Sequence, residues 1–311
     1  MKERKKVIID TDIGDDIDDA LAIFLALRMD YDIIGITTVF LDTEKRARIA
    51  KKLLCEYGNG YEKTPVFAGH GEPIDKYTTE ITMCQYSEEL LCDKYTPDST
   101  SPDIAVDFII DSCHRYGSEL SIIAIGPFTN VARALLKDPS VFDSIGHFII
   151  MGGAYSRQYA DWNVTCDVAA ADIMFKNVKR IECLGADVTH KLSIGSENYI
   201  RLLSLEAEGA ERYICECLKR WRAKNGSLIP MLHDPLAVYY LENPDICLMC
   251  DAPVKVITEG PARGITLNLD AYSKAKFNPY LHNFDANTKA LVAEDVDAKR
   301  MVYAFMSAFS L

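Results

Sequence analysis

The segment that decides the fold is Lys6–Met29, which reads KVIIDTDIGDDIDDALAIFLALRM. Its apolar, β-branched start, Val7–Asp10, predicts a buried strand. Apolar residues then recur three and four positions apart over Ala20–Met29, which predicts a helix. Gly14 lies between these two elements and permits a tight turn of the backbone. A strand that leads through a turn into a helix is the first half of a βαβ unit.

The same alternation continues along the 311 residues. Further strands are predicted over Ile33–Phe40, Leu120–Ile125, His147–Met151, Ile181–Val188, Val254–Thr258 and Gly264–Leu269. Helices are predicted over Glu44–Glu56, Ile104–Tyr116, Phe128–Leu136, Ala169–Lys176, Ala207–Arg222 and Val296–Phe309. This order predicts an α/β fold with a mostly parallel sheet, in which ligands bind at the carboxyl ends of the strands. No linker-like composition interrupts residues 1–311, so we expect a single domain. The polar stretch Tyr77–Ser101 is predicted to be a loop and a candidate lid.

Composition and charge restrict the classes of partner. The net charge of −12 argues against binding to a nucleic-acid backbone, which needs a basic face. No apolar run approaches 18 residues, so we expect no membrane span, and the short apolar run after the basic N-terminus does not fit a signal peptide. The ten cysteines complete no zinc-binding set and are interpreted as buried, reduced thiols. We therefore expect a cytoplasmic protein.

The turn between the first strand and helix carries six carboxylates from Asp10 to Asp19. Such groups repel one another unless protons or a cation neutralise them, and many oxygen ligands suit Ca²⁺ or Mg²⁺. Capping of the helix explains one or two acidic residues at its start, but not six. An EF-hand is excluded because Gly14 stands at the fifth position, where that motif needs an acidic or amide ligand. The turn therefore predicts a divalent-cation site.

Three later segments carry groups suited to the same site. His233 and Asp234 open a helix, where the aspartate can add a metal ligand and the histidine can protonate a leaving group. The strand break in residues 122–130 can offer a main-chain carbonyl to a cation. Residues 151–154 contain two glycines that let a ligand approach, and residues 161–163 place a carboxylate and an amide around an aromatic ring, as sugar binding requires. Each segment alone also fits an ordinary helix start, strand–helix junction or polar loop.

Together these segments resemble the inosine–uridine-preferring nucleoside hydrolase family. The matching motifs are D-T-D…D-D-A-L-A at 10–22, I-T-T-V at 36–39, G-P-F-T-N at 126–130, M-G-G-A at 151–154, W-N at 162–163, H-D-P-L-A-V at 233–238 and G-x-x-x-G-I-T at 260–266. The resemblance covers almost the whole chain. It implies a single domain with a Rossmann-like core that hydrolyses the N-glycosidic bond of ribonucleosides, releasing base and ribose in purine or pyrimidine salvage. It also implies Ca²⁺ at the carboxyl edge of the sheet, and assembly as a homodimer or homotetramer.

The resemblance also implies roles for individual residues. The implied metal ligands are Asp12, Asp19, Asp234 and the carbonyl of Ile125. The implied catalytic residues are Asp18, as general base on a water held by the ion, and His233, as the group that protonates the departing base. The implied substrate-binding residues are Asp42, Met151, Asp161, Trp162, Asn163 and His233, with the ribose hydroxyls held by Asp161, Asn163 and the ion.

The chain departs from the family pattern in the opening motif, which is longer by two residues. Asp15 and Asp16 therefore have no counterparts, and Asp16 competes with Asp18 as general base or with Asp19 as ligand. Which of Asp15, Asp16 and Asp18 faces the water stays open at this point.

Three other departures affect the substrate contacts. Asp42 follows Val39-Phe40-Leu41 where the family usually has Gly-Asn, so an acid replaces an amide. The stretch Tyr155–Ala160 is shortened, so the usual contact to the ribose 5′-hydroxyl does not follow from the resemblance. Gln85–Leu90 replaces the usual His-Gly-x-Asp-Gly-Leu loop, so a nucleobase preference does not follow from the family.

Two alternatives remain at this stage. A haloacid-dehalogenase-like phosphatase also begins with a strand that ends in D-x-D, and it would use Asp10 as nucleophile and Asp12 as acid with Mg²⁺. A non-catalytic nucleoside- or sugar-binding protein on the same fold would fit the changes at Asp42 and Tyr155–Ala160.

Overall fold

The apolar run at the start of the chain forms a strand near the middle of a large sheet. The computed structural model describes residues 4–75, 95–157, 159–269 and 289–310, and within them one sheet has the strand order β3-β2-β1-β4-β5-β6-β10-β7. Its strands are β1 (Lys6–Thr11), β2 (Asp32–Thr38), β3 (Val66–Ala68), β4 (Leu120–Ala124), β5 (His147–Met151), β6 (Arg180–Leu184), β7 (Cys247–Ala252) and β10 (Lys289–Val296). Neighbouring strands are parallel except for β10 and β7, which pair antiparallel. A separate antiparallel pair joins β8 (Val254–Val256) to β9 (Thr266–Asn268).

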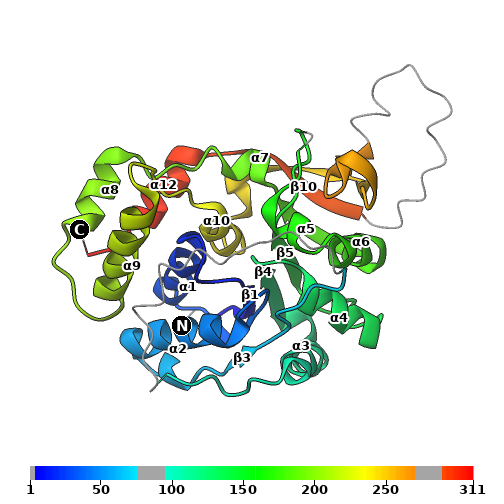
Figure 1. The fold of residues 1–311 in the computed structure, drawn as a ribbon, viewed down its shortest axis with the longest axis horizontal. Helices are drawn as coiled ribbons and strands as arrows, with labels where there is room; N and C mark the ends of the chain where they lie inside the picture. Colours follow the sequence, from blue (N-terminus) through cyan, green and yellow to red (C-terminus); the bar gives the residue numbers. More distant parts are fainter. Residues whose placement is uncertain (1–3, 76–94, 158, 270–288, 311) are drawn as a thin grey trace.

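Helices cover both faces of this sheet. They are α1 (Asp18–Arg28), α2 (Thr43–Tyr57), α3 (Pro102–Tyr116), α4 (Thr129–Lys137), α5 (Trp162–Cys166), α6 (Val168–Asn177), α7 (Ala186–Thr189), α8 (Ser196–Leu203), α9 (Gly209–Asn225), α10 (His233–Tyr240) and α12 (Ala298–Met306). Figure 1 shows α1, α9 and α10 on one side of the sheet and α3, α4 and α6 on the other. Alternate side chains of β1 serve the two faces: Ile9 joins the core beneath α1 and Ile8 the core beneath α4. None of the described helices is both long and apolar enough to cross a bilayer.

The structure confirms the predicted α/β class and the mostly parallel sheet, with some differences in the elements. The run Ile181–Val188 was predicted as one strand, but the strand ends at Leu184 and Ala186–Thr189 forms α7. Both parts are buried, and a short apolar run does not distinguish a buried strand from a buried helical turn. Of the predicted loop Tyr77–Ser101, residues 77–94 lie outside the described part of the chain.

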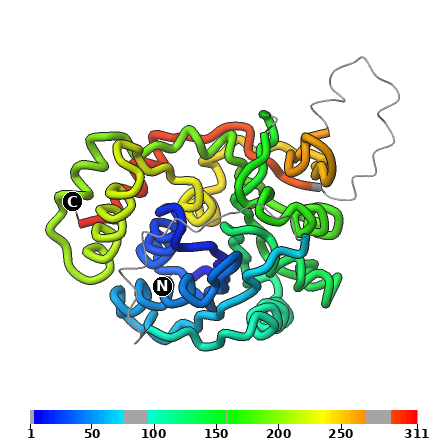
Figure 2. The backbone as a smooth tube through the Cα atoms, viewed as in Figure 1, coloured from blue at the N-terminus to red at the C-terminus, as the bar shows by residue number. Residues whose placement is uncertain are grey.

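The loops after the strands converge at the carboxyl edge of the sheet. Gly14 has a φ of 124°, which lets the chain turn from β1 into α1. Gly126, just after β4, is packed so closely that a Cβ atom there would lie 2.8 Å from the main-chain nitrogen of Asp12. The backbone drawn in Figure 2 also brings the blue start of the chain beside the yellow segment of α10, and α1 and α10 pack together. Residues from both ends of the sequence are thereby placed around one point.

Candidate active site

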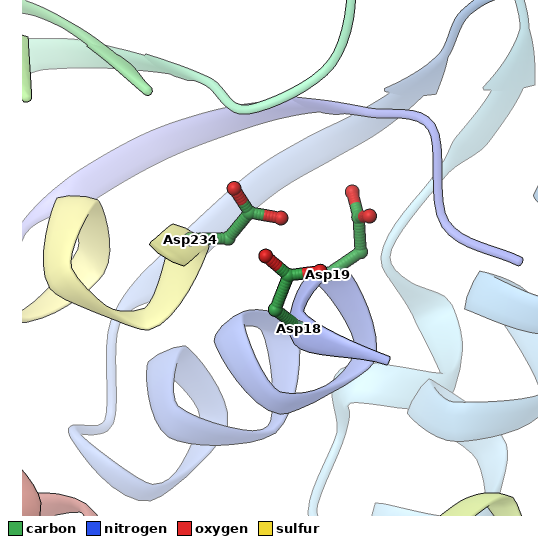
Figure 3. A group of neighbouring side chains, drawn as sticks. All are labelled: Asp18, Asp19 and Asp234. Carbon is green, nitrogen blue, oxygen red and sulfur yellow. The ribbon is translucent and has the colours of Figure 1, made fainter. Parts of the chain in front are cut away.

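Three buried carboxylates form the centre of this region. Asp18 and Asp19 begin α1, and Asp234 is the second residue of α10. One carboxylate oxygen from each residue lies within 4.8 Å of the others, and the three side chains face a common space in Figure 3. Their exposed fractions are only 6%, 3% and 3%. Burial of like charges at this distance is unfavourable without a neutralising partner.

The pKa values of these carboxylates also indicate that their negative charges need a neutralising partner. Burial raises the pKa of Asp18, Asp19 and Asp234 well above the ordinary value of 3.8, and the neighbouring carboxylates raise it further. Burial also raises the pKa of Asp12 to about 7, against the opposing effects of Arg46 and of a hydrogen bond from the Trp162 side chain.

A divalent cation fits this set of oxygen donors. The carboxylates of Asp12, Asp19 and Asp234 border the same cavity as Ile125, whose main-chain oxygen is a further candidate ligand. The Asn163 side-chain amide donates to that oxygen at 2.8 Å, which leaves one lone pair of the carbonyl for a ligand. Several oxygen donors of this kind suit a hard cation such as Ca²⁺.

The carboxylates lie in a cavity of about 490 Å³ that is large enough for a nucleoside-sized molecule. Its lining contains every site residue predicted from the sequence except Asp42. The residues are Asp12, Asp15, Asp16, Asp18, Asp19, Ile125, Met151, Tyr159, Ala160, Asp161, Trp162, Asn163, Ala186, His190, Trp221, Asn225, Leu228, His233 and Asp234.

The segment around Asp161 gives one wall of the cavity a fixed geometry. Asp161 caps α5 by accepting from the Val164 main-chain nitrogen at 3.0 Å, and the same oxygen accepts from the Gly153 nitrogen at 2.8 Å. The amide nitrogen of Asn163 donates to the Met151 carbonyl at 3.0 Å as well as to Ile125. These contacts hold a buried carboxylate and a buried amide toward the cavity. Such a pair is suited to hydroxyl groups.

Two histidines occupy another wall. The Nδ1 atom of His233 lies 2.6 Å from the Thr189 hydroxyl, and the His190 ring stands edge-on to His233 at 5.0 Å. The Tyr159 hydroxyl lies 2.9 Å from Nδ1 of His190. Burial and the neighbouring His190 lower the pKa of His233 to about 4, so the ring is neutral at pH 7. When Thr189 donates to Nδ1, the neutral ring carries its proton on Nε2 and acts as a hydrogen-bond donor.

Some lining residues were not assigned from the sequence. They are Tyr159, Ala160, Ala186, His190, Trp221, Asn225 and Leu228. His190 follows β6 by six residues, so its place beyond the carboxyl end of a parallel strand was an available signal. Trp221 offered no such signal, because it also fits the buried face of α9, and it is only 5% exposed.

Asp42 is the one predicted substrate residue that the structure places apart from the cavity. Its carboxylate caps α2 by accepting from the Lys45 main-chain nitrogen at 3.1 Å, and Lys45 Nζ lies 3.3 Å from its other oxygen. The side chain is 41% exposed. The stretch Gln85–Leu90, which replaces the usual loop of the family in this sequence, lies outside the described residues.

Comparisons with known proteins find similarity over almost the whole chain. The family model described as inosine-uridine preferring nucleoside hydrolase matches residues 7–303. The probable uridine nucleosidase 1 of Oryza sativa subsp. japonica is 31% identical over 277 residues, which cover 85% of either chain. A plant nucleoside hydrolase, the PpNRh1 enzyme, has a solved structure with a TM-score of 0.82 at 26% identity, covering 98% of this chain and 99% of that one. The purine-preferring ribonucleoside hydrolase from Gardnerella vaginalis gives a TM-score of 0.78 at 28% identity, covering 98% of each chain.

Proposed function

Because the chain belongs to the inosine-uridine preferring nucleoside hydrolase family, we propose that it is a Ca²⁺-dependent enzyme that cleaves the N-glycosidic bond of ribonucleosides to free base and ribose. The observation that carries the proposal is the single cavity that joins the buried carboxylates, the Asp161–Asn163 wall and His233. These groups provide, in one place, a cation site, sugar contacts and a donor for the leaving base.

The proposed ligands of the cation are Asp12, Asp19, Asp234 and the Ile125 carbonyl. Ca²⁺ tolerates irregular sets of carboxylate and carbonyl oxygens better than Mg²⁺, which demands near-octahedral geometry. When bound, the cation supplies charge that orients vicinal hydroxyls and makes water more acidic.

Asp18 is the proposed general base. It is 6% exposed and lines the cavity as the first residue of α1. Its raised pKa, caused by burial and by the neighbouring Asp16 and Asp12, brings its basicity closer to neutral pH, where general bases act best. Nearby carboxylates also stabilise the positive charge that develops on the ribose ring as the bond breaks.

His233 is proposed to assist departure of the base. Its neutral ring donates from Nε2 when Thr189 holds Nδ1, and this hydrogen bond offsets the negative charge that develops on the leaving base. Asp161 and Asn163 are proposed to bind ribose hydroxyls, with Met151 and Trp162 bordering the sugar.

The phosphatase alternative needs Asp10 as a nucleophile, which the structure does not favour. Asp10 is fully buried, and its Oδ1 atom accepts from Thr37 at 2.5 Å and from Asn130 at 2.7 Å. It is not among the residues that line the cavity. Membership of a family of hydrolases likewise favours an enzyme over a protein that only binds nucleosides.

Ribose release from a panel of nucleosides tests the proposal. We expect wild-type protein to release ribose, EDTA to abolish the release and added Ca²⁺ to restore it. Asp18→Asn should lower kcat by about 10²–10⁴-fold, the usual contribution of a general base. Asp107→Asn is the matched control, since Asp107 lies on α3 in an exposed ion pair with Lys137. Activity that is unchanged by EDTA, or hydrolysis of phosphate esters in place of nucleosides, would contradict the proposal.

The proposal also covers the domain organisation, the assembly, the location and the partner of the chain. We place residues 1–311 in a single nucleoside hydrolase domain that assembles as a homodimer or homotetramer, which light scattering would measure. We also propose a cytoplasmic location, with a nucleoside as partner in place of nucleic acid or membrane. Burial raises the pKa of the Cys113 and Cys217 thiols to about 12, which suits thiols that stay reduced.

A further inference from the structure

A fully buried arginine lies beneath the proposed cation site. Arg46 is on the first turns of α2, and its side chain is 0% exposed. Arginine is rarely buried to this degree unless its charge and its donors are satisfied. The site described above assigns Arg46 no role, although its charge lies next to the aspartate turn.

The guanidinium group joins two loops at the carboxyl edge of the sheet. Its Nε atom donates to the Phe40 carbonyl, just after β2, at 2.7 Å. One terminal nitrogen donates to the main-chain carbonyls of Asp12 and Ile13, the latter at 3.2 Å. The other donates to Asp15 Oδ2 at 2.7 Å. One side chain thus fixes the backbone at Asp12, whose carboxylate faces the cavity.

Two of the departures from the family pattern meet at this arginine. Asp15 belongs to the pair of additional residues in the opening motif, and Phe40 belongs to the altered loop after β2. Phe40 and Leu41 have φ values of 71° and 57°, a region that residues with side chains seldom adopt. Such a conformation persists when surrounding contacts hold it, and Arg46 supplies one of them at Phe40.

The contact between Arg46 and Asp15 also sets the local charge. Asp15 Oδ2 accepts a hydrogen bond from Arg46. Asp15 Oδ1 is buried and accepts none from the described residues, so Arg46 is the hydrogen-bonding partner of this carboxylate there. The two opposite charges cancel at short range. Arg46 therefore does not repel a cation as a lone positive charge would.

We propose that Arg46, with Asp15 as its counter-ion, is a positioning residue that fixes the shape and the charge of the cation site. The inference rests on the proposed function only for the existence of that site. It assigns one of the two additional acidic residues to structure, and it leaves Asp16 and Asp18 as the candidates for the general base.

The first test compares two arginines on the same helix. Arg46→Lys keeps the charge but cannot reach all four acceptors, whereas Arg48→Lys changes a half-buried residue that pairs with Glu44. Titration calorimetry with Ca²⁺ should show a Kd raised roughly 10–100-fold in Arg46→Lys, the usual effect of losing a contact that orients ligands. It should show no change in Arg48→Lys. Equal Kd values for wild type and Arg46→Lys would overturn the proposal.

The second test uses Asp15→Asn, which keeps the shape of the side chain and removes its charge. Arg46 is then left unbalanced next to Asp12, so the Kd for Ca²⁺ should rise, whereas Asp107→Asn, a change in an exposed ion pair on α3, should leave the Kd unchanged. A general base would instead lose about 10²–10⁴-fold in kcat with unchanged Ca²⁺ affinity, and that outcome would overturn the assignment of Asp15.

These measurements separate the inference from the proposed function. Calorimetry detects Ca²⁺ binding without turnover, so wild-type protein that binds Ca²⁺ but releases no ribose contradicts the proposed activity and leaves the Arg46 test intact. Wild-type protein that binds no Ca²⁺ overturns the inference as well. Thermal unfolding without Ca²⁺ shows whether each variant is folded. If Arg46→Lys does not fold, the Ca²⁺ calorimetry of Asp15→Asn tests the proposal.

Discussion

The contact between Thr189 and His233 determines which nitrogen of the imidazole can serve the leaving base. We expect Thr189→Val, which preserves side-chain shape but removes the hydroxyl, to free the ring to change tautomer. kcat for uridine and inosine should then fall by roughly 10-fold, short of the ~10²–10⁴-fold of a complete general-acid contribution. Steady-state ribose release gives the measurement.

An activated substrate provides the control for this variant. A nitrophenyl riboside leaves as a stable phenolate and needs no proton from His233, so its turnover by Thr189→Val should match wild type. A parallel loss for both kinds of substrate would show that Thr189 acts on some other step.

For single residues, the sequence predicted which side chains belong to the candidate site better than it predicted their contacts. The acidic turn predicted a cation site around Asp12, Asp18 and Asp19, because so many acids cannot stay close together without a cation. Asp234 was predicted from the His-Asp pair that opens a later helix. Arg46 and Trp221 were not, because a charged or aromatic residue with helical spacing fits the surface or the core equally well. Asp42 was assigned by its position in a motif, whereas its helix-capping geometry became visible only in three dimensions.

Among the elements, the junction of β4 with α4 controls how closely the loops after β1 and β4 approach each other. Gly126→Ala would place a Cβ atom 2.7 Å from Val39 Cγ1 and 2.8 Å from the Asp12 nitrogen. The backbone must shift to relieve these contacts, at a cost of about 1–3 kcal/mol in the free energy of unfolding. The shift also moves Asp12, so Ca²⁺ affinity should fall together with stability; denaturant unfolding and calorimetry measure the two effects.

Gly195→Ala separates crowding from backbone strain. Gly195 has a φ of 78° before α8, but a Cβ atom there would meet nothing within 4 Å. This variant should lose about 1–2 kcal/mol of stability from strain alone and keep its affinity for Ca²⁺. If both variants weaken Ca²⁺ binding to the same degree, the close packing at Gly126 has no special part in the site.

Long elements with a clear period were predictable, and short or edge elements were not. The spacing of apolar residues identified α1 and α9, although α9 continues to Asn225, three residues beyond the predicted end at Arg222. Strand β3 has three residues, too few to show a pattern. Strand β7, at the end of the sheet, has exposed and half-buried positions without regular alternation, so its pairing with β10 was not foreseen.

For the whole molecule, we expect Ca²⁺ to stabilise the fold, and to do so more strongly at pH 8 than at pH 5. Burial raises the pKa of Asp10 and Asp12 to about 7, from 3.8 in an ordinary environment. Without metal, the folded state therefore binds protons more tightly than the unfolded chain, and the free energy of unfolding falls as pH rises from about 4 to about 7. A bound cation offsets the part of this loss that comes from Asp12, a proposed ligand, by compensating its ionised carboxylate.

Thermal unfolding with and without Ca²⁺ at both pH values tests this expectation. At a free Ca²⁺ concentration of 100 times Kd, binding adds about 2.7 kcal/mol to the free energy of unfolding. Asp234→Asn should abolish most of the shift, since it removes the carboxylate contributed by α10. Equal shifts of Tm at pH 5 and pH 8 would mean that the buried carboxylates do not cause the pH dependence of stabilisation by Ca²⁺.

The nucleobase preference belongs to the whole molecule too, and the sequence could not supply it. Related proteins carry names that specify uridine in one case and purines in another. Tyr159, His190 and Trp221 line the cavity from three separate parts of the chain. Their mutual placement depends on tertiary packing, which no local pattern encodes.

The pairing of α1 with α10 has a consequence for biosynthesis. Asp19 and Asp234 are 215 positions apart in the sequence, so the ribosome adds Asp234 long after Asp19. A nascent chain that has not yet reached α10 lacks one of the three clustered carboxylates. On the proposed function, such a chain cleaves no nucleoside, and activity begins only when these distant parts of the chain have been made and have packed together.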